Sequence, residues 1–281
     1  MAAKVGRLEE TMSYDVLDVK PLTLTIGAEI GGVDLTKPVS NRQAAELREA
    51  ISEFQVIFFR DQVLDHESHI RFGRIFGELA IHSGVAGLDG YPEIVAIHAD
   101  ENSKNVAGEN WHSDLTMNEI PPMGSILYLH TVPEVGGDTM FASMYAAYDA
   151  LSDRMKTYLD GLYAEHDGNH VYKPLFPDID REYPCSNHPI IRTHPVTRKK
   201  SIFINSSYVT KIIGVSKDES DYILSFLYKH ITNPNFNCRF RWKPHSVAFW
   251  DNRCTQHLAV WDYFPQTRSG YRVTIAGEAV M

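Results

Sequence analysis

Residues 110–116 constrain the fold more than any other stretch, because a histidine and an aspartate stand two positions apart among β-favouring neighbours. In an extended strand, side chains at positions i and i+2 point to the same face. If this segment is a strand, a ring nitrogen of His112 and a carboxylate oxygen of Asp114 both reach one metal ion. His257, far downstream in residues 250–257, offers a third ligand. The fold must then bring two distant parts of the chain to one point.

Two imidazoles and one carboxylate make the facial triad of non-haem Fe(II) oxygenases, which leaves three coordination positions open. The same donors suit Zn²⁺ in a hydrolase, although the sequence has no His-Glu-x-x-His pattern. One His-x-Asp pattern is weak evidence, because such a histidine more often lies in a surface turn, or in a strand where its ring nitrogens are hydrogen-bonded. The chain carries a second pattern of this kind at His98 and Asp100. The triad therefore needs support from the rest of the sequence.

Two arginines that follow His257 give this support. Arg268 and Arg272 lie four positions apart in residues 267–275, so they share one face if that run is a strand. An inward-facing arginine is costly unless it meets an anion. Its guanidinium group can hold a carboxylate or a sulfonate through two parallel hydrogen bonds. We therefore expect a site for small anionic organic molecules beside the metal.

Four motifs follow one another along the chain: residues 111–114, residues 136–139, residues 250–253 with His257, and the pair Arg268 and Arg272. In this order and spacing they resemble the taurine dioxygenase family, including its alkylsulfatase-like and aryloxyalkanoate dioxygenase-like members. The resemblance extends from about Val19 to Gly277, which is nearly the whole chain.

The resemblance implies an Fe(II)- and 2-oxoglutarate-dependent dioxygenase that uses O2. His112, Asp114 and His257 would be the metal ligands and the catalytic residues. Thr139 and Arg268 would bind the C5 carboxylate of 2-oxoglutarate. The reaction would oxidise a C–H bond of the substrate and release succinate and CO2.

The resemblance also places substrate-binding residues. His82 and Arg272 would hold the anionic head of the substrate. Val85 and Gly108 stand where the family has a tyrosine and an asparagine that bind taurine, and both changes remove polar partners. The loss of polar partners can account for most of the discrimination of a site between substrates. We therefore expect an alkyl sulfonate, an alkyl sulfate ester or an aryloxyalkanoate rather than taurine.

Three alternatives stay open beside the zinc hydrolase. One is a taurine dioxygenase proper, and another is a non-catalytic binding module with the same fold, which would not decarboxylate 2-oxoglutarate. The third is halogenation, but related halogenases lack the carboxylate ligand and Asp114 is present. Oxygen insertion or desaturation is therefore favoured.

Composition excludes several classes of partner. The formal net charge of −9, without a dense run of lysine and arginine, argues against nucleic-acid binding. We see neither a signal peptide nor an apolar run of about 20 residues, so no membrane span is expected. The three cysteines are unclustered, which is typical of a reducing cytoplasm. The family resemblance implies a homo-oligomer, either a dimer or a tetramer.

Periodicity predicts a mainly β protein with inserted helices, consistent with the double-stranded β-helix, or jelly roll, of the family. We expect a loose arm at residues 1–15, one domain at residues 16–281, and irregular active-site loops at residues 77–110 and 168–189. Strands are predicted at residues 19–26, 56–59 and 125–130, among others. Capping residues and periodicity predict helices at residues 41–54, 66–76 and 217–230, the last with Tyr222, Ile223, Phe226 and Leu227 facing inward.

Overall fold

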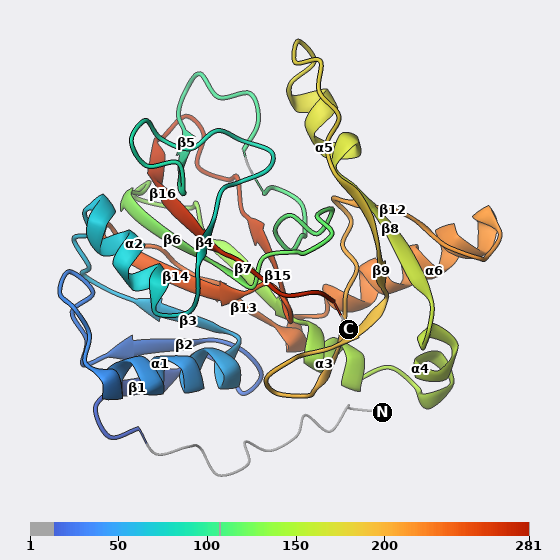
Figure 1. Ribbon diagram of the computed structural model, residues 1–281, viewed down its shortest axis with the longest axis horizontal. Coiled ribbons are helices and arrows are strands. Elements are labelled where there is room, and N and C mark those ends of the chain that lie inside the picture. The colour runs from blue at the N-terminus through green and yellow to red at the C-terminus, as the bar shows by residue number, and fades with distance from the viewer. Residues whose placement is uncertain (1–13, 107, 281) are drawn as a thin grey trace.

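Strands make up most of the regular structure in the described residues, 14–106 and 108–280, of this computed structural model (Figure 1). The mainly β prediction with inserted helices is thus confirmed. The largest sheet has eight strands, all antiparallel to their neighbours except the parallel pair formed by the second and third. In spatial order they are β1 (Asp18–Pro21), β2 (Ala28–Gly31), β3 (Val56–Phe59), β14 (Ser246–Asp251), β6 (Gly124–Thr131), β16 (Arg268–Ile275) and β4 (Leu79–Ala80), with β5 (Ile94–Ala99) also paired to β16.

A second sheet faces the first and encloses an aromatic core with it. Its strands are β13 (Asn237–Phe240), β7 (Thr139–Ser143) and β15 (Thr255–Ala259). Phe58 of β3 stacks on Phe240 with ring centroids 3.9 Å apart, and it meets Phe141 edge-on at 5.5 Å. Such contacts stabilise a core beyond the apolar area that they bury. Trp250 of β14 belongs to this core and packs on His257 with ring centroids 4.6 Å apart, so the core supports a candidate ligand directly.

Two helices cover the outer face of the large sheet, α1 (Asn41–Phe54) and α2 (His66–Arg74) (Figure 1). Ser40 and Gln43 form a capping box at the start of α1, and Asp65 and Ser68 form one at the start of α2, as the sequence predicted for the N-caps. Their apolar faces pack on β3 and β14, which is why the predicted strand at residues 56–59 is buried throughout.

A third layer lies beside the two sheets (Figure 1). It contains a three-stranded sheet, a hairpin and helices that share one apolar cluster. These elements are β8 (Tyr163–Asp167), β9 (Cys185–Pro189), β12 (Val209–Ile212), β10 (Ile191–Thr193), β11 (Lys200–Ile202), α3 (Met144–Asp149), α4 (Asp153–Leu159), α6 (Lys217–Ile231) and the 3-10 helix η1 (Pro234–Phe236).

Residues 168–189 are more regular than expected. They contain the helix α5 (Gly168–Leu175) and then strand β9, which pairs with β8. Asp167 caps α5 by accepting the N–H of Asn169 at 2.8 Å, and Pro174 lies in its last turn. The prolines led us to expect a loop, but Pro177 lies beyond the end of α5 and Pro189 ends β9, an edge strand of its sheet, where proline is tolerated.

Two further expectations are wrong in detail. The strand expected at residues 19–26 ends at Pro21, because Thr23 turns the chain by bonding to the backbone of Ile26. On α6, Tyr222 and Phe226 face solvent, with exposed fractions of 79% and 45%. Leu227 is buried as predicted, and the other buried positions of this helix are Ser220, Leu224 and Ile231.

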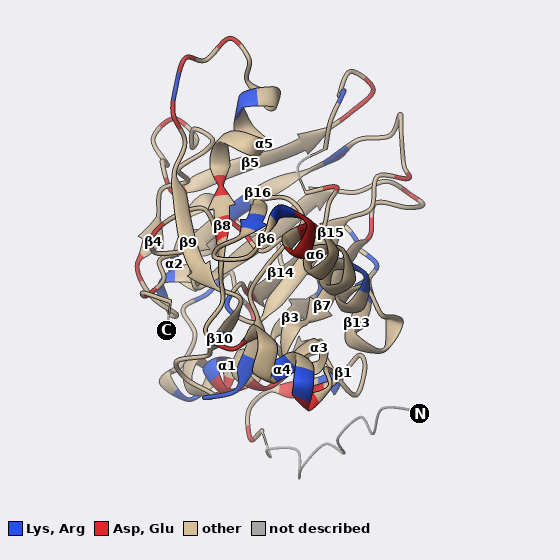
Figure 2. Ribbon diagram, turned by 90° about the vertical axis from the view of Figure 1, so that its right-hand side faces the viewer, with Lys and Arg blue, Asp and Glu red and all other residues tan. Residues whose placement is uncertain are grey.

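The described part of the expected N-terminal arm is held in place. Residues 1–13 lie outside the described residues. From Asp15 to Leu17, three successive backbone N–H groups donate to the carboxylate of Glu46 on α1 at 3.0–3.1 Å, and the Tyr14 hydroxyl donates to Glu53 at 2.7 Å. Lysine and arginine are interspersed with aspartate and glutamate in the view of Figure 2. Within the described chain, no helix combines the length and apolarity needed to cross a membrane.

Candidate active site

A backbone bridge brings the two distant histidines together. The N–H of His112 donates to the carbonyl oxygen of His257 at 3.0 Å, and the N–H of His257 donates back to the carbonyl of His112 at 2.8 Å. His257 is part of β15, whereas His112 forms only this isolated bridge. The two rings therefore lie with centroids 4.1 Å apart.

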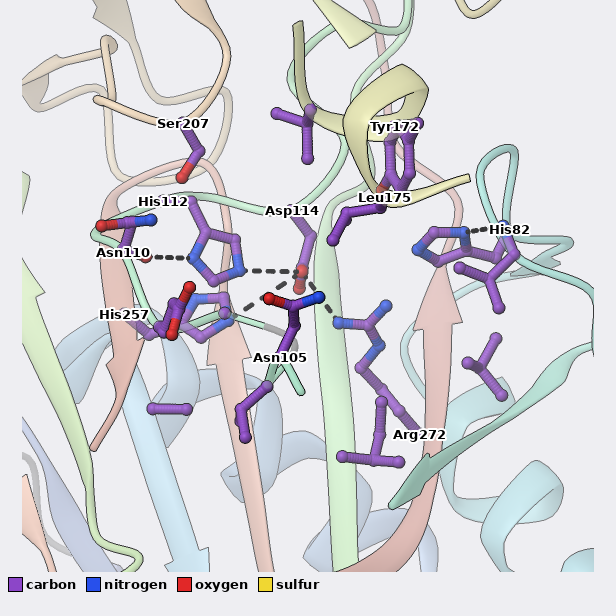
Figure 3. A pocket seen from close by; sticks show the side chains of 18 of the residues that line it. His82, Asn105, Asn110, His112, Asp114, Tyr172, Leu175, Ser207, His257 and Arg272 are labelled. Atoms are coloured by element: carbon purple, nitrogen blue, oxygen red, sulfur yellow. Dashed lines mark hydrogen bonds and ion pairs between the residues drawn. The ribbon is translucent and has the colours of Figure 1, made fainter. Parts of the chain in front are cut away.

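Asp114 reaches the same point from a turn. Residues 114–117 form a turn in which Leu115 has a φ of 49°, so the strand geometry expected for residues 110–116 is wrong. The convergence of the ligands is nevertheless as expected. Oδ1 of Asp114 lies 3.7 Å from Nε2 of His112 and 3.9 Å from Nε2 of His257 (Figure 3).

These three side chains fit a metal ion. Nitrogen and oxygen ligands lie about 2.0–2.2 Å from a bound divalent ion, so two ligands of one ion are separated by at most about twice that distance. Both distances from Asp114 meet this limit. Nδ1 of His112 lies 2.8 Å from the carbonyl oxygen of Asn110, which makes Nδ1 the protonated nitrogen and leaves the lone pair of Nε2 toward the centre.

The charges of the site also suit a cation. Burial alone would raise the pKa of Asp114, but Arg272 and the two imidazoles outweigh this effect and hold that pKa well below its usual range. Burial, and then His112, lower the pKa of His257 well below its ordinary value. The carboxylate is therefore ionised and the His257 imidazole is neutral, which are the forms that bind metals.

A second buried cluster of ligand-type side chains does not fit a metal. It contains His194, Asp251 and Cys254. Nδ1 of His194 accepts two backbone N–H groups, so its Nε2 carries the proton and donates to Asp251 at 3.0 Å. The carboxylate also binds Arg253 at 2.6 and 2.9 Å, and burial raises the pKa of the Cys254 thiol well above its usual value. This cluster is an ion pair within the core.

Arg268 and Thr139 lie together at the inner end of the site. Both hydrogen bonds of Arg268 within the described chain go to neutral oxygens, the carbonyl of Gly137 at 3.1 Å and Oγ1 of Thr139 at 3.3 Å. Burial lowers the pKa of Arg268 to about 10. Oγ1 of Thr139 also accepts the indole N–H of Trp242 at 2.9 Å. Because this oxygen accepts two hydrogen bonds, its own hydrogen is free for an anionic ligand.

Arg272 and His82 lie on the other side of the triad (Figure 3). NH1 of Arg272 donates to Oδ1 of Asp114 at 3.0 Å, and its Nε is buried without a partner among the described residues. Nδ1 of His82 accepts the N–H groups of Gly84 and Val85, each at 3.0 Å. Nε2 of His82 therefore carries the proton and points toward the cavity. Burial, and then Arg272, lower the pKa of His82 to about 3, so this ring is a neutral donor.

A cavity of about 750 Å³ connects these groups and extends under α5. Its outer wall is largely apolar, with Val171, Leu175 and Phe176. The buried hydroxyl groups of Tyr172 and Tyr208 lie 3.1 Å apart on this wall. One hydroxyl donates its hydrogen to the oxygen of the other, so the hydrogen of the second hydroxyl has no partner within the pair.

Val85 and Gly108, expected to shape the substrate site, both line the cavity. Gly108 has a φ of +84°, and a Cβ atom there would lie 2.8 Å from Cε1 of His112. The His112 ring therefore packs against Gly108 and takes the space that a side chain would need there. His98 of the other His-x-Asp pattern also lines the cavity, but it is half exposed and lies 3.5 Å from Asp100.

Several residues of the site were missed by sequence reasoning. Trp242, Tyr172 and Tyr208 were given no role in the site, and neither was Ser125, whose hydroxyl donates to Oδ2 of Asp114 at 2.7 Å. A polar residue at an inward position of a strand was the only available signal for Ser125. No local pattern marks the other three.

Comparisons with known proteins point to one family. The model of the family "Taurine catabolism dioxygenase TauD, TfdA family" matches residues 18–274. The chain is 35% identical to an alpha-ketoglutarate-dependent sulfate ester dioxygenase of Pseudomonas putida, over 93% of this chain and 90% of that protein. A crystal structure of a taurine dioxygenase from Burkholderia xenovorans superposes with a TM-score of 0.84 at 37% identity, over 95% and 91% of the two chains. The structure of AAD-2 with Mn(II) and N-oxalylglycine gives a TM-score of 0.83 at 30% identity, over 94% and 98%.

Proposed function

This chain belongs to the TauD, TfdA family and is an Fe(II)- and 2-oxoglutarate-dependent dioxygenase, and we propose that it oxidises a C–H bond of an organic sulfonate or sulfate ester with an apolar body. The observation that carries the proposal is the placement of two arginines on either side of the triad. Arg268 lies at the inner end of the cavity, and Arg272 lies beside Asp114 at the outer end. We further propose that residues 16–281 form one domain with the double-stranded β-helix fold, and that the protein is a homo-oligomer.

We assign the metal to His112, Asp114 and His257. When Fe(II), 2-oxoglutarate and O2 are bound, they supply the oxidant for an unactivated C–H bond while 2-oxoglutarate becomes succinate and CO2. The task of the protein is to hold that C–H bond near the metal and to exclude water, because a near-attack arrangement and a dry site lower the barrier.

We assign the C5 carboxylate of 2-oxoglutarate to Arg268 and Thr139. A guanidinium group that is 4% exposed and bonded only to neutral oxygens in the described chain needs an anion to offset its desolvation. The free hydroxyl hydrogen of Thr139 gives a second, charge-assisted hydrogen bond to the same group. Trp242 orients Thr139 for this role by occupying one of its lone pairs.

The head group of the substrate is assigned to Arg272, His82 and the tyrosine pair. These groups offer one positive charge and neutral N–H and O–H donors, but no acceptor other than the tyrosine oxygens. Donors from several sides suit the three oxygens of a sulfonate or sulfate ester better than the two oxygens of a planar carboxylate. The only carboxylates that line the cavity in the described chain are Asp114 and the exposed Glu109, so the amine of taurine has no buried acidic partner apart from the metal ligand.

The apolar wall of α5 gives the proposed preference for a larger body. Val171, Leu175 and Val85 all line the cavity. An alkyl chain placed against these side chains gains about 0.8 kcal/mol for each buried CH₂ group.

Succinate formation by the Fe(II)-loaded enzyme tests the proposal. The panel holds taurine, longer alkyl sulfonates, alkyl sulfates and aryloxyacetates, with Asp114→Ala as the inactive control. We expect the alkyl sulfonates or sulfates to stimulate succinate release, with one aldehyde formed per sulfate ester cleaved. Tightly coupled turnover of taurine, without turnover of the bulkier anions, contradicts the proposed substrate class. Absence of any succinate above the control contradicts the site assignment.

A further inference from the structure

The two carboxylate oxygens of Asp114 have different surroundings. Oδ1 is the atom that lies 3.7 and 3.9 Å from the two imidazole Nε2 atoms. Oδ2 instead accepts the hydroxyl of Ser125 at 2.7 Å. Only one of the two oxygens is therefore turned toward the point where the three side chains converge.

Ser125 is a fixed donor. It is fully buried on β6, where it pairs with Trp250 of β14 on one side and Thr274 of β16 on the other. Its oxygen accepts Nδ2 of Asn252 at 3.3 Å, so its single hydrogen is directed to Asp114.

Asn252 ties the same serine to the backbone of the ligand. Its Oδ1 accepts the backbone N–H of Asp114 at 3.1 Å and the indole N–H of Trp250 at 3.0 Å. Both of these groups can only donate, which fixes the amide orientation and leaves Nδ2 for Ser125. One amide thus holds both the main chain of Asp114 and the hydroxyl that binds its side chain.

This arrangement affects how many coordination positions stay open. A carboxylate can bind a metal through one oxygen or both. The facial triad leaves three positions open only if Asp114 binds through one oxygen. If 2-oxoglutarate binds through its C1 carboxylate and keto oxygen, as the family resemblance implies, it would take two of these positions and leave one for O2.

We propose that Ser125, oriented by Asn252, is a positioning residue that keeps Asp114 a one-oxygen ligand and so preserves the position for O2. This inference rests on the proposed assignment of His112, Asp114 and His257 as the metal ligands. Loss of a hydrogen-bond partner of a metal ligand typically costs about 10- to 100-fold in metal affinity or activity.

Metal and co-substrate binding to Ser125→Ala tests the proposal without turnover. Mn(II) affinity is measured by titration calorimetry under argon, followed by 2-oxoglutarate affinity at saturating Mn(II). We expect Mn(II) affinity to change by about tenfold or more, and 2-oxoglutarate affinity to fall because the second carboxylate oxygen competes for a position. Ser125→Thr, which keeps the hydroxyl, should restore both values.

Ser201→Ala is the matched control. Ser201 is also fully buried on a strand, and its hydroxyl donates to the carbonyl of Arg253 at 3.2 Å, away from the triad. Thermal unfolding of all variants reports any general loss of structure. We expect Ser201→Ala to bind Mn(II) and 2-oxoglutarate like the wild type.

The outcomes separate this inference from the site assignment. If Ser125→Ala binds Mn(II) and 2-oxoglutarate within twofold of the wild type while Asp114→Ala has lost Mn(II), the ligand assignment stands and the role of Ser125 is refuted. If Asp114→Ala binds Mn(II) as tightly as the wild type, the assignment and the inference both fail.

Discussion

Thr139→Val should separate two functions of one hydroxyl group. Valine keeps the shape of threonine but removes its polar atom. In the wild type, Oγ1 accepts Trp242 Nε1 at 2.9 Å and Arg268 NH2 at 3.3 Å, and its hydrogen is free for 2-oxoglutarate. The substitution therefore removes a ligand contact and also leaves the buried indole N–H of Trp242 without a partner.

The two losses have different magnitudes and different assays. A hydrogen bond to a charged group contributes about 1.5–3 kcal/mol, so the Kd for 2-oxoglutarate should rise roughly 10- to 100-fold, measured by titration of the Mn(II)-loaded protein. The unpaired indole N–H should lower the free energy of unfolding by about 1–3 kcal/mol, measured by urea denaturation without ligands. Thr139→Ser is expected to preserve both values.

A double variant refines this prediction. Replacing both partners of a buried hydrogen bond by apolar groups can be nearly neutral, so Thr139→Val with Trp242→Phe should regain most of the stability lost by Thr139→Val. Its affinity for 2-oxoglutarate should stay low, because the hydroxyl is still missing. Affinity within twofold of the wild type in either variant would refute the assigned role of Thr139.

Three other perturbations have expected outcomes. Burial lowers the pKa of His69 in the folded protein to about 4. In the unfolded chain the pKa of this histidine is near 6.5, so the unfolded state binds the proton first as the pH falls. The free energy of unfolding therefore decreases as the pH falls through 6.5 toward 4. We expect the free energy of unfolding to fall by about 2 kcal/mol between pH 7 and pH 5, and by less in His69→Phe. An equal fall in that variant contradicts the prediction. Tyr208→Phe should raise KM for sulfate esters roughly tenfold, with no rise if the tyrosine pair does not face the head group. Mn(II) at about 100 times its Kd should stabilise the protein by about 2.7 kcal/mol, an effect absent in Asp114→Ala and reversed by chelation.

The sequence predicted best those elements that depend on nearby residues. The capping residues Ser40 and Ser216 begin α1 and α6 where expected, because each cap is completed by a side chain three positions later. The apolar run of β3 is likewise explained by its own residues. The predicted buried face of α6 was wrong for Tyr222 and Phe226. Packing against the other elements of the third layer turns Leu224 inward, and no local pattern encodes that packing.

The candidate site divides in the same way. His112, Asp114, His257 and Arg268 carry a chemistry that their residue types and order reveal. The role of Ser125 depends instead on the pairing of β6 with β14, two strands distant in sequence. The role of Trp242, which follows β13, depends on its contact with Thr139 of β7. An apolar or small residue at such positions is common in any sheet. Prediction from sequence therefore finds the candidate metal ligands and the anion-binding arginine, and misses the neutral groups that orient them.

The backbone bridge makes the geometry of the proposed metal site depend on strand register. His257 pairs with Phe141 of β7 on one side and bridges to His112 on the other. Side chains along a strand alternate between faces, so a shift of one residue in β15 would turn His257 away from Asp114. The Thr139 position is set by the same pairing, since it lies opposite Ala259. The proposed ligand of the metal and the proposed donor to 2-oxoglutarate are thus held in one register, because both belong to the sheet of β13, β7 and β15.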